Sequence, residues 1–380
     1  MPQLSVWEKE SFFAHQDILI IGGGLAGLWS ALHLKLLNPA YKITLLDRGL
    51  VPAGASTRNA GFCCFGSPSE LITDAHEMGA EKMWSLVSKR YHGLIEIGKF
   101  FTDTEIDFET TGGYECFSRE SLEWNSCAGQ LEWLNTGLYK ITGEKNVFTI
   151  ADEKIAGFGF RGFSHMIENK LEGALHPGKL VQALMRRVQS AGVQILPGVE
   201  VLRYEEREDI VRILTGNDIV FTSSRLLLCT NAFTRELVPS FDIIPNRGQV
   251  QLTGPVDGLP FKGTFHCQRG YYYFRNLGSR LLIGGARNKA LEDENTASMD
   301  TTTVIQDELE NFVRTHLLPR TPYTITDRWS GIMGMGTEKS PVIKALSKRV
   351  YCCVRMSGMG VALAPVVAKE VALLMHGDFL

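Results

Sequence analysis

Residues 17–47 carry the pattern of a strand, a glycine turn, a helix and a second strand, in the sequence DILIIGGGLAGLWSALHLKLLNPAYKITLLD. The first strand is apolar throughout, which is typical of a parallel strand covered on both faces. Asn38 and Pro39 end the helix, and KITLLD gives the second short apolar strand. The chain therefore begins as an α/β fold.

Apolar residues recur at three- and four-residue steps from Ser67 to about Thr104, which predicts helices there. Residues 176–192 predict a helix that begins at a proline and ends at a glycine. Strands follow in VQILPGVEVLRYEE, DIVRIL, DIVFTS and RLLLCT, and residues 245–287 alternate as an antiparallel sheet does. A helix is expected at about 301–316, before the last block, RVYCCVRMSGMGVALAPVVAKEVALLM. Three separate segments of the chain therefore have an α/β pattern, and two segments with an antiparallel pattern are inserted between them.

Charge and hydropathy narrow the classes of partner. Lys and Arg number 39 against 42 for Asp and Glu, and no basic stripe stands out, which argues against nucleic acid. The apolar run Ile18–Leu34 is split by three glycines and follows no basic segment, so it reads as neither a signal peptide nor a membrane span. The stretch Val361–Met375 contains Lys369 and Glu370, and we expect a buried terminal helix there. We therefore expect a soluble, cytoplasmic protein without a membrane span.

Eight cysteines occur, at positions 63, 64, 116, 127, 229, 267, 352 and 353. No CxxC motif occurs, two pairs are adjacent in sequence, and no His or Cys stands at a recognised metal-ligand spacing. We expect buried, reduced thiols and no metal site.

The glycine turn fits the pattern G-x-G-x-x-G, from Gly22 to Gly27, between a strand and a helix. In that context the first glycine allows a tight turn, the next lets the backbone approach a pyrophosphate, and the last lets helix and strand pack closely. Asp47 ends the following strand, 20 residues past Gly27, where it can accept hydrogen bonds from a ribose diol. The motif predicts a dinucleotide cofactor, either NAD or FAD.

Two further segments favour FAD. GASTRNAGF, residues 54–62, consists almost entirely of small side chains around one arginine, and SGMGVALAP, residues 357–365, is a second glycine loop that runs into a helix. A helix N-terminus stabilises the negative charge that develops at one edge of a flavin ring, by roughly 0.3–1 kcal/mol. These two segments of small residues, together with the glycine turn for a pyrophosphate, are typical of an extended flavin site. We expect GASTRNAGF to lie along the flavin.

With LLDRG, LHPGKLVQAL, GVEV, RLLLCTNAF, PNRGQV, RLLIGG and RWSGIMG, these segments resemble the D-amino-acid oxidase-like family of FAD-dependent oxidoreductases, which includes glycine oxidase and sarcosine oxidase. The segments follow the family's order over essentially the whole chain. The resemblance implies FAD and oxidation of the C–N bond of an amine or amino acid by hydride transfer to flavin N5. It also places Val201 at an adenine clamp, and Thr230 and Asn231 near the cofactor.

The expected cofactor-binding residues combine the motifs with this resemblance. They are Gly22, Gly23, Gly24, Leu25, Ala26, Gly27, Asp47, Arg48, Ala55, Ser56, Arg58, Asn59, Ala60, Gly61, Phe62, Val201, Thr230, Asn231, Gly331, Ser357, Gly358, Met359, Gly360 and Val361.

Four specialised residues of the family have no counterpart here. The segment RWSGIMGMGTEKSP lacks the cysteine through which sarcosine oxidases hold flavin covalently, which implies non-covalent FAD. The carboxylate-binding arginine of glycine oxidases matches Met333, and two lysines of sarcosine oxidases match positions near Ala362 and Leu282. Because the second lysine is linked to oxygen activation, dehydrogenase behaviour is favoured over oxidase behaviour. Arg355 stands where relatives have a small residue, and it either binds an anion or forms a salt bridge.

Several polar side chains are candidates for the substrate end of the site. Arg58 is the first choice for a role beside flavin N5, although it could instead tie two loops together. Arg58 and Arg355 are thus the candidate catalytic residues. Tyr271 and Tyr273 share one face of a strand and either line the pocket or pack. Two family-like arginines, at 247 and 275, are expected to be structural, and His176 is expected to start a helix.

Together these observations predict an α/β fold with a Rossmann-like FAD-binding domain of discontinuous segments, residues 1–66, 166–235 and 324–380. A substrate domain of residues 67–165 and 236–323 should be built on a mixed or antiparallel sheet. The expected function is oxidation of a small amine or amino acid, with O2 or another electron acceptor. The alternatives are a flavin-carrying, non-catalytic subunit and an NAD-dependent dehydrogenase.

Overall fold

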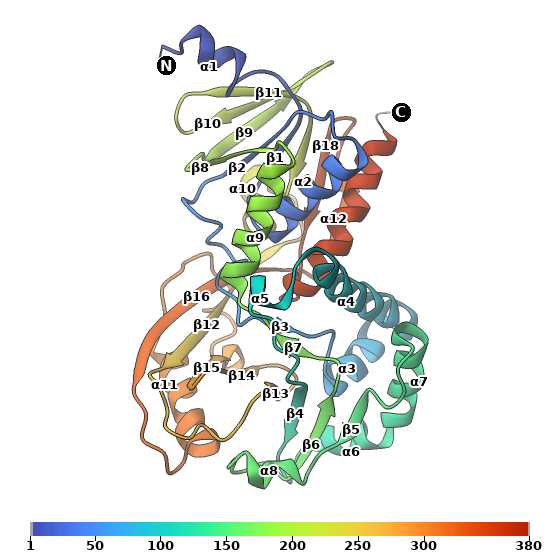
Figure 1. Ribbon diagram of the computed structural model, residues 1–380, viewed down its shortest axis with the longest axis vertical. Coiled ribbons are helices and arrows are strands. Elements are labelled where there is room, and N and C mark those ends of the chain that lie inside the picture. The colour runs from blue at the N-terminus through green and yellow to red at the C-terminus, as the bar shows by residue number, and fades with distance from the viewer. Residues whose placement is uncertain (1–2, 379–380) are drawn as a thin grey trace.

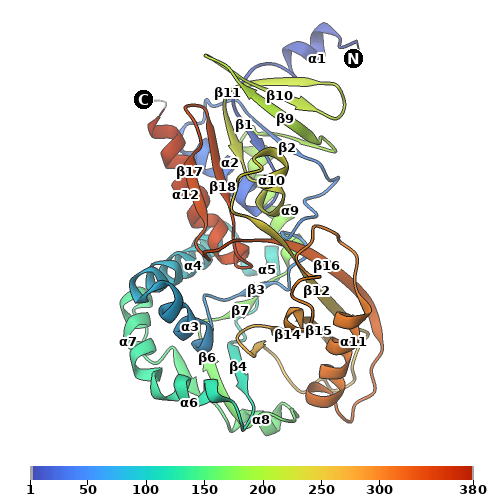
Figure 2. The same cartoon turned by 180° about the vertical axis from the view of Figure 1, so that it is seen from behind.

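The computed structural model describes residues 3–378, which form two units stacked along the long axis, each built on an eight-stranded sheet (Figures 1 and 2). In the upper unit the strand order is β17-β18-β11-β1-β2-β8, and β10 and β9 extend from β11. Strands β18, β11, β1, β2 and β8 pair in parallel, as the apolar first strand predicted for β1. Their bounds are β1 (Gln16–Ile21), β2 (Ile43–Asp47), β8 (Gln194–Pro197), β9 (Val201–Glu206), β10 (Val211–Thr215), β11 (Val220–Leu228), β17 (Val342–Ala345) and β18 (Val350–Val354).

Three helices cover one face of this sheet and form its core with β1 and β2: α2 (Leu25–Leu37), α9 (Pro177–Ser190) and α12 (Gly360–Gly377). Local chemistry explains where α9 starts. Pro177 has no N–H, so it leaves no unpaired donor in the first turn of the helix. Nδ1 of His176 accepts a hydrogen bond from the Lys179 amide at 3.3 Å. Against α12 lies α4 (Ala80–Phe100), where a Cβ built on Gly93 would be 1.7 Å from the Ala362 carbonyl oxygen. Gly93 therefore allows the two helix backbones to touch.

The lower unit holds a sheet in the order β16-β12-β15-β14-β13-β4-β6-β5, antiparallel except between β13 and β4. A cluster of buried phenylalanines fills its core, including the stacked rings of Phe265 and Phe274 at 4.8 Å. The strands are β4 (Gly113–Phe117), β5 (Phe148–Ile150), β6 (His165–Asn169), β12 (Ile244–Thr253), β13 (Thr264–Cys267), β14 (Tyr272–Leu277), β15 (Arg280–Gly285) and β16 (Ile325–Met335).

Helices surround the lower sheet, and a two-stranded ribbon lies between the units (Figure 1). The remaining elements are α1 (Val6–Glu10), β3 (Phe62–Cys63), α3 (Pro68–Met78), α4 (Ala80–Phe100), α5 (Asp103–Ile106), α6 (Leu122–Gly129), α7 (Leu131–Thr142), α8 (Lys154–Gly157), β7 (Gly173–Ala174), η1 (Asn231–Phe233), α10 (Thr234–Leu237), η2 (Arg287–Lys289), α11 (Thr303–Phe312) and a π-turn at Val313–Leu317.

The predicted fold class is confirmed, and two details differ. The helical stretch from 67 to 104 is broken at Gly79, whose φ of 87° ends α3 and lets α4 start in a new direction. Strands β6 and β16 pair in the lower sheet although residues 166–235 and 324–380 were assigned to the FAD-binding domain. A strand's sheet is decided by its partners, and these two strands pair with β4 and β12.

Among the described residues, α12 is the helix that is long and apolar enough to cross a membrane by composition. Half of its apolar window is buried inside the molecule, where α12 packs on α2 and α4. Burial of this kind matches the terminal core helix expected from the sequence.

Candidate functional site

A cavity of about 650 Å³ lies where the two units meet. Its lining combines five segments: the first glycine turn, the segment from 52 to 62, the loop that follows β11, the middle of β16 and the loop before α12. Its volume falls in the range of roughly 300–1,000 Å³ that is usual for small-molecule sites. Segments more than 300 residues apart in sequence therefore share one binding site.

The first glycine turn is shaped by contacts that exclude side chains. Gly22 has φ of 107°, and a Cβ on it would lie 2.5 Å from the Cys229 carbonyl oxygen. A Cβ on Gly27 would lie 1.9 Å from the Gly22 carbonyl oxygen. The turn thus leads directly into α2, whose N-terminal amides face an anion-binding position.

Asp47 is fixed beside this turn by two backbone amides. Its carboxylate accepts hydrogen bonds from the amides of Gly23 at 2.7 Å and Gly49 at 2.8 Å. Burial raises the pKa of Asp47, and these two hydrogen bonds oppose the rise. The carboxylate lines the cavity and can accept further hydrogen bonds from a diol.

Residues 54–62 are held rigidly along one wall. Nη1 of Arg275 is buried and donates to the carbonyl oxygens of Gly61 at 3.2 Å and Leu175 at 2.9 Å. Ser56 Oγ accepts from the Leu25 amide at 2.9 Å, which joins this wall to the start of α2. Arg275 is therefore structural, as predicted, and it fixes the backbone of the small-residue segment.

Arg58 projects from this wall into the cavity. Its Nη1 donates to the Ser330 carbonyl oxygen at 3.0 Å, and its own carbonyl oxygen accepts from Trp329 Nε1 at 3.0 Å. No carboxylate pairs with Arg58 among residues 3–378, so most of its five N–H donors are available to a ligand.

The loop before α12 presents an unpaired polar atom to the opposite wall. Ser357 has φ of 47°, and its buried Oγ finds no hydrogen-bond partner in the described part of the chain. Gly358, with φ of 81°, has only the Met333 sulfur within reach of an added Cβ, at 3.4 Å. Helix α12 starts two residues later, so a polar ring edge would meet Ser357 and a helix N-terminus together. These features fit a flavin.

Most of the predicted cofactor residues line this cavity. Those that do are Gly22, Gly24, Leu25, Ala26, Asp47, Arg48, Ala55, Ser56, Arg58, Asn59, Ala60, Phe62, Val201, Thr230, Asn231, Gly331, Ser357, Gly358, Met359, Gly360 and Val361. Gly23, Gly27 and Gly61 lie behind the lining, where their contacts with Asp47, Gly22 and Leu175 shape the wall.

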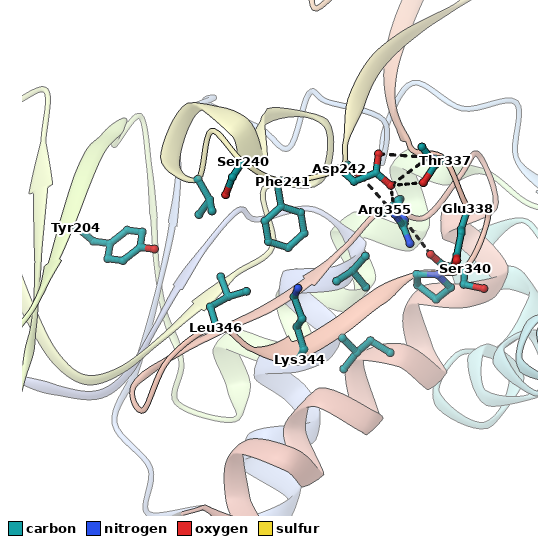
Figure 3. Close-up of a pocket in the computed structure, with 14 residues that line it drawn as sticks. Tyr204, Ser240, Phe241, Asp242, Thr337, Glu338, Ser340, Lys344, Leu346 and Arg355 are labelled. Atoms are coloured by element: carbon teal, nitrogen blue, oxygen red, sulfur yellow. Dashed lines mark hydrogen bonds and ion pairs between the residues drawn. The ribbon is translucent and has the colours of Figure 1, made fainter.

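Arg355 does not line this cavity, and its prediction as a catalytic residue at the cofactor loop is wrong. Its guanidinium instead borders a second cavity of about 810 Å³ (Figure 3). There it donates to the Asp242 carboxylate at 2.7 Å and to the Ser340 carbonyl oxygen at 2.9 Å. Arg355 has a left-handed backbone conformation, with φ of 65°. The salt-bridge alternative is the one that the structure supports.

The cavity also has lining residues that the sequence did not single out as a group, most of them from the lower unit. Tyr271 and Tyr273 both line the cavity, whereas Tyr272 on the other face is buried. Five methionines contribute thioethers, and several titratable groups join them. Besides the predicted Met359, these further lining residues are Cys64, Glu70, Thr73, Glu77, His266, Arg269, Arg287, Met299, Met333, Met335, Lys339 and Met356.

Burial sets the protonation of two of these groups. It lowers the pKa of His266 to about 4, so the imidazole is neutral near pH 7. It also raises the pKa of Tyr273 to about 12, so the phenol keeps its proton. Of the positions matched to missing family residues, Met333 and Ala362 line the cavity, and Leu282 lies in an apolar cluster.

An ion-pair network borders the cavity on the α3 side. Lys339 binds the Asp74 carboxylate and lies 3.9 Å from Oε1 of Glu70. Oε1 of Glu70 also accepts from the buried Arg90 at 3.0 Å, and these two cations lower the pKa of Glu70 although its burial opposes them. The network ties the loop after β16 to α3 and α4 and neutralises its own charges.

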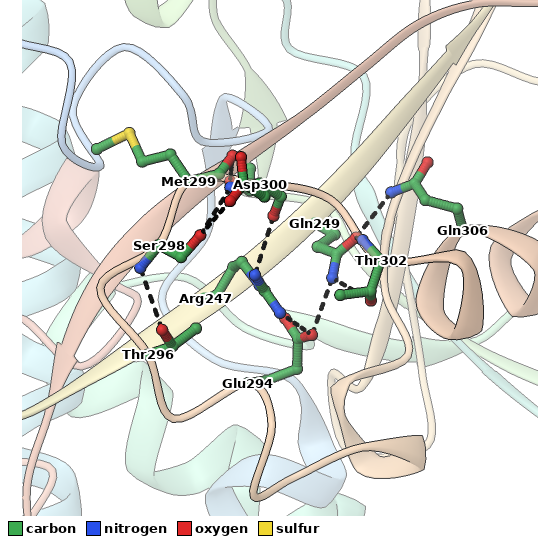
Figure 4. Close-up of polar contacts among 10 residues, drawn as sticks. Arg247, Gln249, Glu294, Thr296, Ser298, Met299, Asp300, Thr302 and Gln306 are labelled. Carbon is green, nitrogen blue, oxygen red and sulfur yellow. Dashed lines mark hydrogen bonds and ion pairs between the residues drawn. The ribbon is translucent and has the colours of Figure 1, made fainter.

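A second network anchors the segment that carries Met299 (Figure 4). Arg247 on β12 pairs with Glu294 through Nε at 2.9 Å and Nη2 at 2.8 Å, and both side chains are buried. Gln249 donates to Glu294 at 2.9 Å and to Thr302 at 2.8 Å. Arg247 is therefore structural, as predicted.

No group of three or more potential metal ligands occurs within residues 3–378. All eight cysteines are free and buried there, as the sequence predicted.

Comparisons with known proteins agree on the family. The model of the family described as FAD dependent oxidoreductase, DAO, matches residues 17–374. Probable oxidoreductase OrdL from Haemophilus influenzae is 24% identical over 384 residues, covering 96% of this chain and 84% of its own. The chain spans about half, 52%, of the bifunctional protein ThiO/ThiG from Trichormus variabilis, at 25% identity over 94% of this chain.

Solved structures give the same fold. L-proline dehydrogenase from P. horikoshii superposes with a TM-score of 0.76 at 15% identity, covering 96% of this chain and 94% of the other. Glycine oxidase from Geobacillus kaustophilus superposes with a TM-score of 0.74 at 18% identity, covering 96% and 95%.

Proposed function

The chain belongs to the DAO family of FAD-dependent oxidoreductases, and from that premise we propose that it oxidises the C–N bond of a small amine or amino acid by hydride transfer to flavin N5. The observation that carries this proposal is a continuous cavity with two differently built ends. One end has the glycine turn, Asp47 and Val201, and the other has tyrosines, methionines and Arg58, which pairs with no carboxylate within residues 3–378. The proteins named L-proline dehydrogenase and glycine oxidase share the fold and act on amino acids by name.

Non-covalent FAD is part of the proposal, with Gly24 and the start of α2 at the pyrophosphate, Asp47 at a ribose and Val201 at the adenine. When bound, FAD supplies the acceptor for the two electrons that leave the substrate carbon. No cysteine occurs in residues 328–341, which supports non-covalent binding.

The chain's own residues would aim the substrate, exclude water and supply charge. A largely apolar wall of methionines disfavours an ammonium ion, which lowers the pKa of a bound amine and favours the neutral form. Such positioning can contribute up to roughly 7–11 kcal/mol to barrier reduction. Arg58 is the candidate for electrostatic assistance, because it faces the cavity without a carboxylate partner in residues 3–378. We infer dehydrogenase rather than oxidase behaviour from the buried apolar Leu282, with the electron acceptor left open.

An anaerobic reduction panel tests the proposal. The FAD-loaded protein is mixed without oxygen with amines, amino acids and the matching 2-hydroxy acids, and the flavin absorbance band is followed. We expect at least one nitrogen compound to bleach the band and its hydroxy analogue to leave it unchanged. Bleaching by hydroxy acids alone would overturn the C–N assignment, and indifference to the whole panel would favour the non-catalytic subunit. The NAD-dependent alternative is set aside, because the family that matches the chain uses FAD.

A further inference from the structure

The second cavity, of about 810 Å³, shares no lining residue with the flavin cavity and lies beside an edge of the upper sheet (Figure 3). One side is β17, the last strand in the sheet order, and among residues 3–378 it pairs only with β18. The segment 238–242 forms the other side, and the loop 336–341 lies at one end. A cavity of this volume is in the range of roughly 300–1,000 Å³ that is usual for small-molecule sites.

A buried guanidinium presents free donors to this second cavity. Arg355 is 7% exposed, its Nη1 donates to the Asp242 carboxylate at 2.7 Å, and its Nε donates to the Ser340 carbonyl oxygen at 2.9 Å. Its third nitrogen, Nη2, has no acceptor within residues 3–378. Because Arg355 lines the cavity, the two N–H groups of Nη2 are available to a ligand there.

A second cation lies on the edge strand. Lys344 is exposed, and its Nζ is 5.2 Å from the centroid of the Phe241 ring across the cavity (Figure 3). It pairs with no carboxylate in the described part of the chain. Two acidic residues line the same cavity: Asp242 is neutralised by Arg355, and Glu338 is exposed on the loop at one end. A ligand with one negative charge therefore meets two cations, whereas a second charge on it would add repulsion from the two carboxylates.

The rest of the second cavity is largely apolar. The partly exposed ring of Phe241 lies among Val238, Val342 and Leu346, and the ring of Tyr204 lies beyond Leu346 (Figure 3). All five side chains pack against the core of the upper sheet, which holds them in place. An aromatic ligand can stack on the free face of Phe241, since aromatic pairs attract beyond their buried area.

Arg355 also connects the second cavity to the flavin cavity. Its backbone amide donates to Oδ1 of Asn231 at 3.0 Å, and Asn231 lines the flavin cavity. A Cβ on Gly334 would be 2.8 Å from the same oxygen, so this contact has no free space around it. The loop 336–341 is a second link, because its Lys339 lines the flavin cavity while its other residues line the second one. Closely packed contacts of this kind transmit small displacements.

We propose that the second cavity is an effector site for a small organic monocarboxylate with a flat apolar body, and that its occupation is transmitted to the flavin cavity. The carboxylate accepts hydrogen bonds from Nη2 of Arg355 and from Lys344, and the apolar body lies on Phe241. The site does not depend on which bond the flavin oxidises, so it can be tested separately from the proposed function.

Calorimetric titration of the FAD-loaded protein tests the ligand class. The probes are 2-naphthoate, 2-naphthamide and 2-naphthyl phosphate, which share one ring system. We expect naphthoate to bind at least about 10-fold more tightly than naphthamide, because the amide cannot make the charge-assisted hydrogen bonds. The phosphate, with a charge of about −1.5 to −2 at neutral pH, should bind more weakly than naphthoate. Equal binding of naphthoate and naphthamide, or tightest binding of the phosphate, would overturn the proposal.

Variants show whether the probe lies in the second cavity. Lys344→Met should weaken naphthoate at least about 10-fold and leave naphthamide unchanged, and Lys344→Arg should retain most of the preference. Phe241→Leu should weaken both probes by about 3- to 10-fold, because ring stacking is lost. Lys348→Met is the matched control: it removes the same charge from an exposed residue that does not line the cavity, and it should change neither Kd. An unchanged preference in Lys344→Met, or an equal loss in Lys348→Met, would overturn the site.

The flavin itself reports on transmission between the cavities. With naphthoate at a concentration that saturates the unsubstituted protein, we expect the flavin absorbance spectrum and reduction potential to change in that protein and in Lys348→Met, and to change much less in Lys344→Met. Binding without either change would overturn the effector role. Changes of equal size in Lys344→Met would mean that the probe acts inside the flavin cavity and would also overturn it. If the changes appear as expected while no amine reduces the flavin, the proposed function fails and the effector site stands.

Discussion

Gly27 and Gly98 are both helical glycines, and their surroundings differ. A Cβ on Gly27 would lie 1.9 Å from the Gly22 carbonyl oxygen, whereas one on Gly98 would meet nothing within 4 Å. Gly27→Ala should therefore push α2 away from the glycine turn, and purified protein should contain less than about half of the normal FAD, by the ratio of absorbance at the flavin band to that at 280 nm.

Gly98→Ala is the matched substitution. It should raise the free energy of unfolding by about 0.5–1 kcal/mol, because alanine is the better helix former, and should leave FAD content unchanged. Equal FAD content in both variants would show that the close approach at Gly27 is not needed for binding.

Arg58 gives a prediction about rate. Arg58→Met should slow anaerobic flavin reduction by a reducing substrate at least about 10-fold, because a preorganised charge at the reacting centre is lost. FAD should stay bound, and Arg58→Lys should recover part of the rate. Reduction of Arg58→Met at the unsubstituted rate, measured by stopped flow, would make Arg58 a structural residue.

At the scale of elements, the loop that carries Met299 depends on the buried pair of Arg247 and Glu294. Glu294→Gln leaves Arg247 without a counter-charge inside the protein, and it should lower the free energy of unfolding by about 3–5 kcal/mol. Glu144→Gln breaks the exposed pair with Lys170 and should change it by less than about 1 kcal/mol. Denaturant unfolding of both variants measures the difference, and similar losses would contradict the role of burial.

The sequence predicted the elements with strong local signals. The apolar strands, the glycine turn and the helix that starts at Pro177 all formed as expected, because periodicity and end signals act within a few residues. Sheet membership of β6 and β16 was less predictable, since it depends on partners far away in sequence. Arg355 was misassigned for the same reason: its partner Asp242 is more than 100 residues distant.

At the scale of the whole molecule, two buried carboxyls make stability depend on pH. Burial raises the pKa of Glu115 to about 7 and that of Glu172 to about 8, from 4.5. Between pH 4.5 and those values the folded state holds more protons than the unfolded state, so stability falls as pH rises. Each group contributes up to about 1.4 kcal/mol per pH unit in that window.

The pH dependence can be measured with FAD in fixed excess. The Tm should fall between pH 5 and pH 8, and Glu115→Gln and Glu172→Gln should each make the decline shallower. A Tm that rises over this range in the unsubstituted protein would contradict the neutral, buried state of these carboxyls. So would a decline in both variants as steep as that of the unsubstituted protein.

Acid denaturation addresses how the whole chain holds its cofactor. Because no cysteine lies in residues 328–341, all of the flavin should appear in the supernatant after acid precipitation. Flavin that stays with the pellet would indicate a covalent bond. The cytoplasmic location expected from the sequence stays a prediction.

The central claim is that this protein oxidises a C–N bond on FAD. Its most direct test is an anaerobic single turnover with a compound that bleaches the flavin, followed by measurement of the products after hydrolysis. The account predicts one carbonyl compound and one ammonia or amine released for each FAD reduced, since the imine formed by hydride loss is cleaved by water. Flavin reduction with the C–N bond intact in the product, or no reduction by any amine or amino acid, would contradict it.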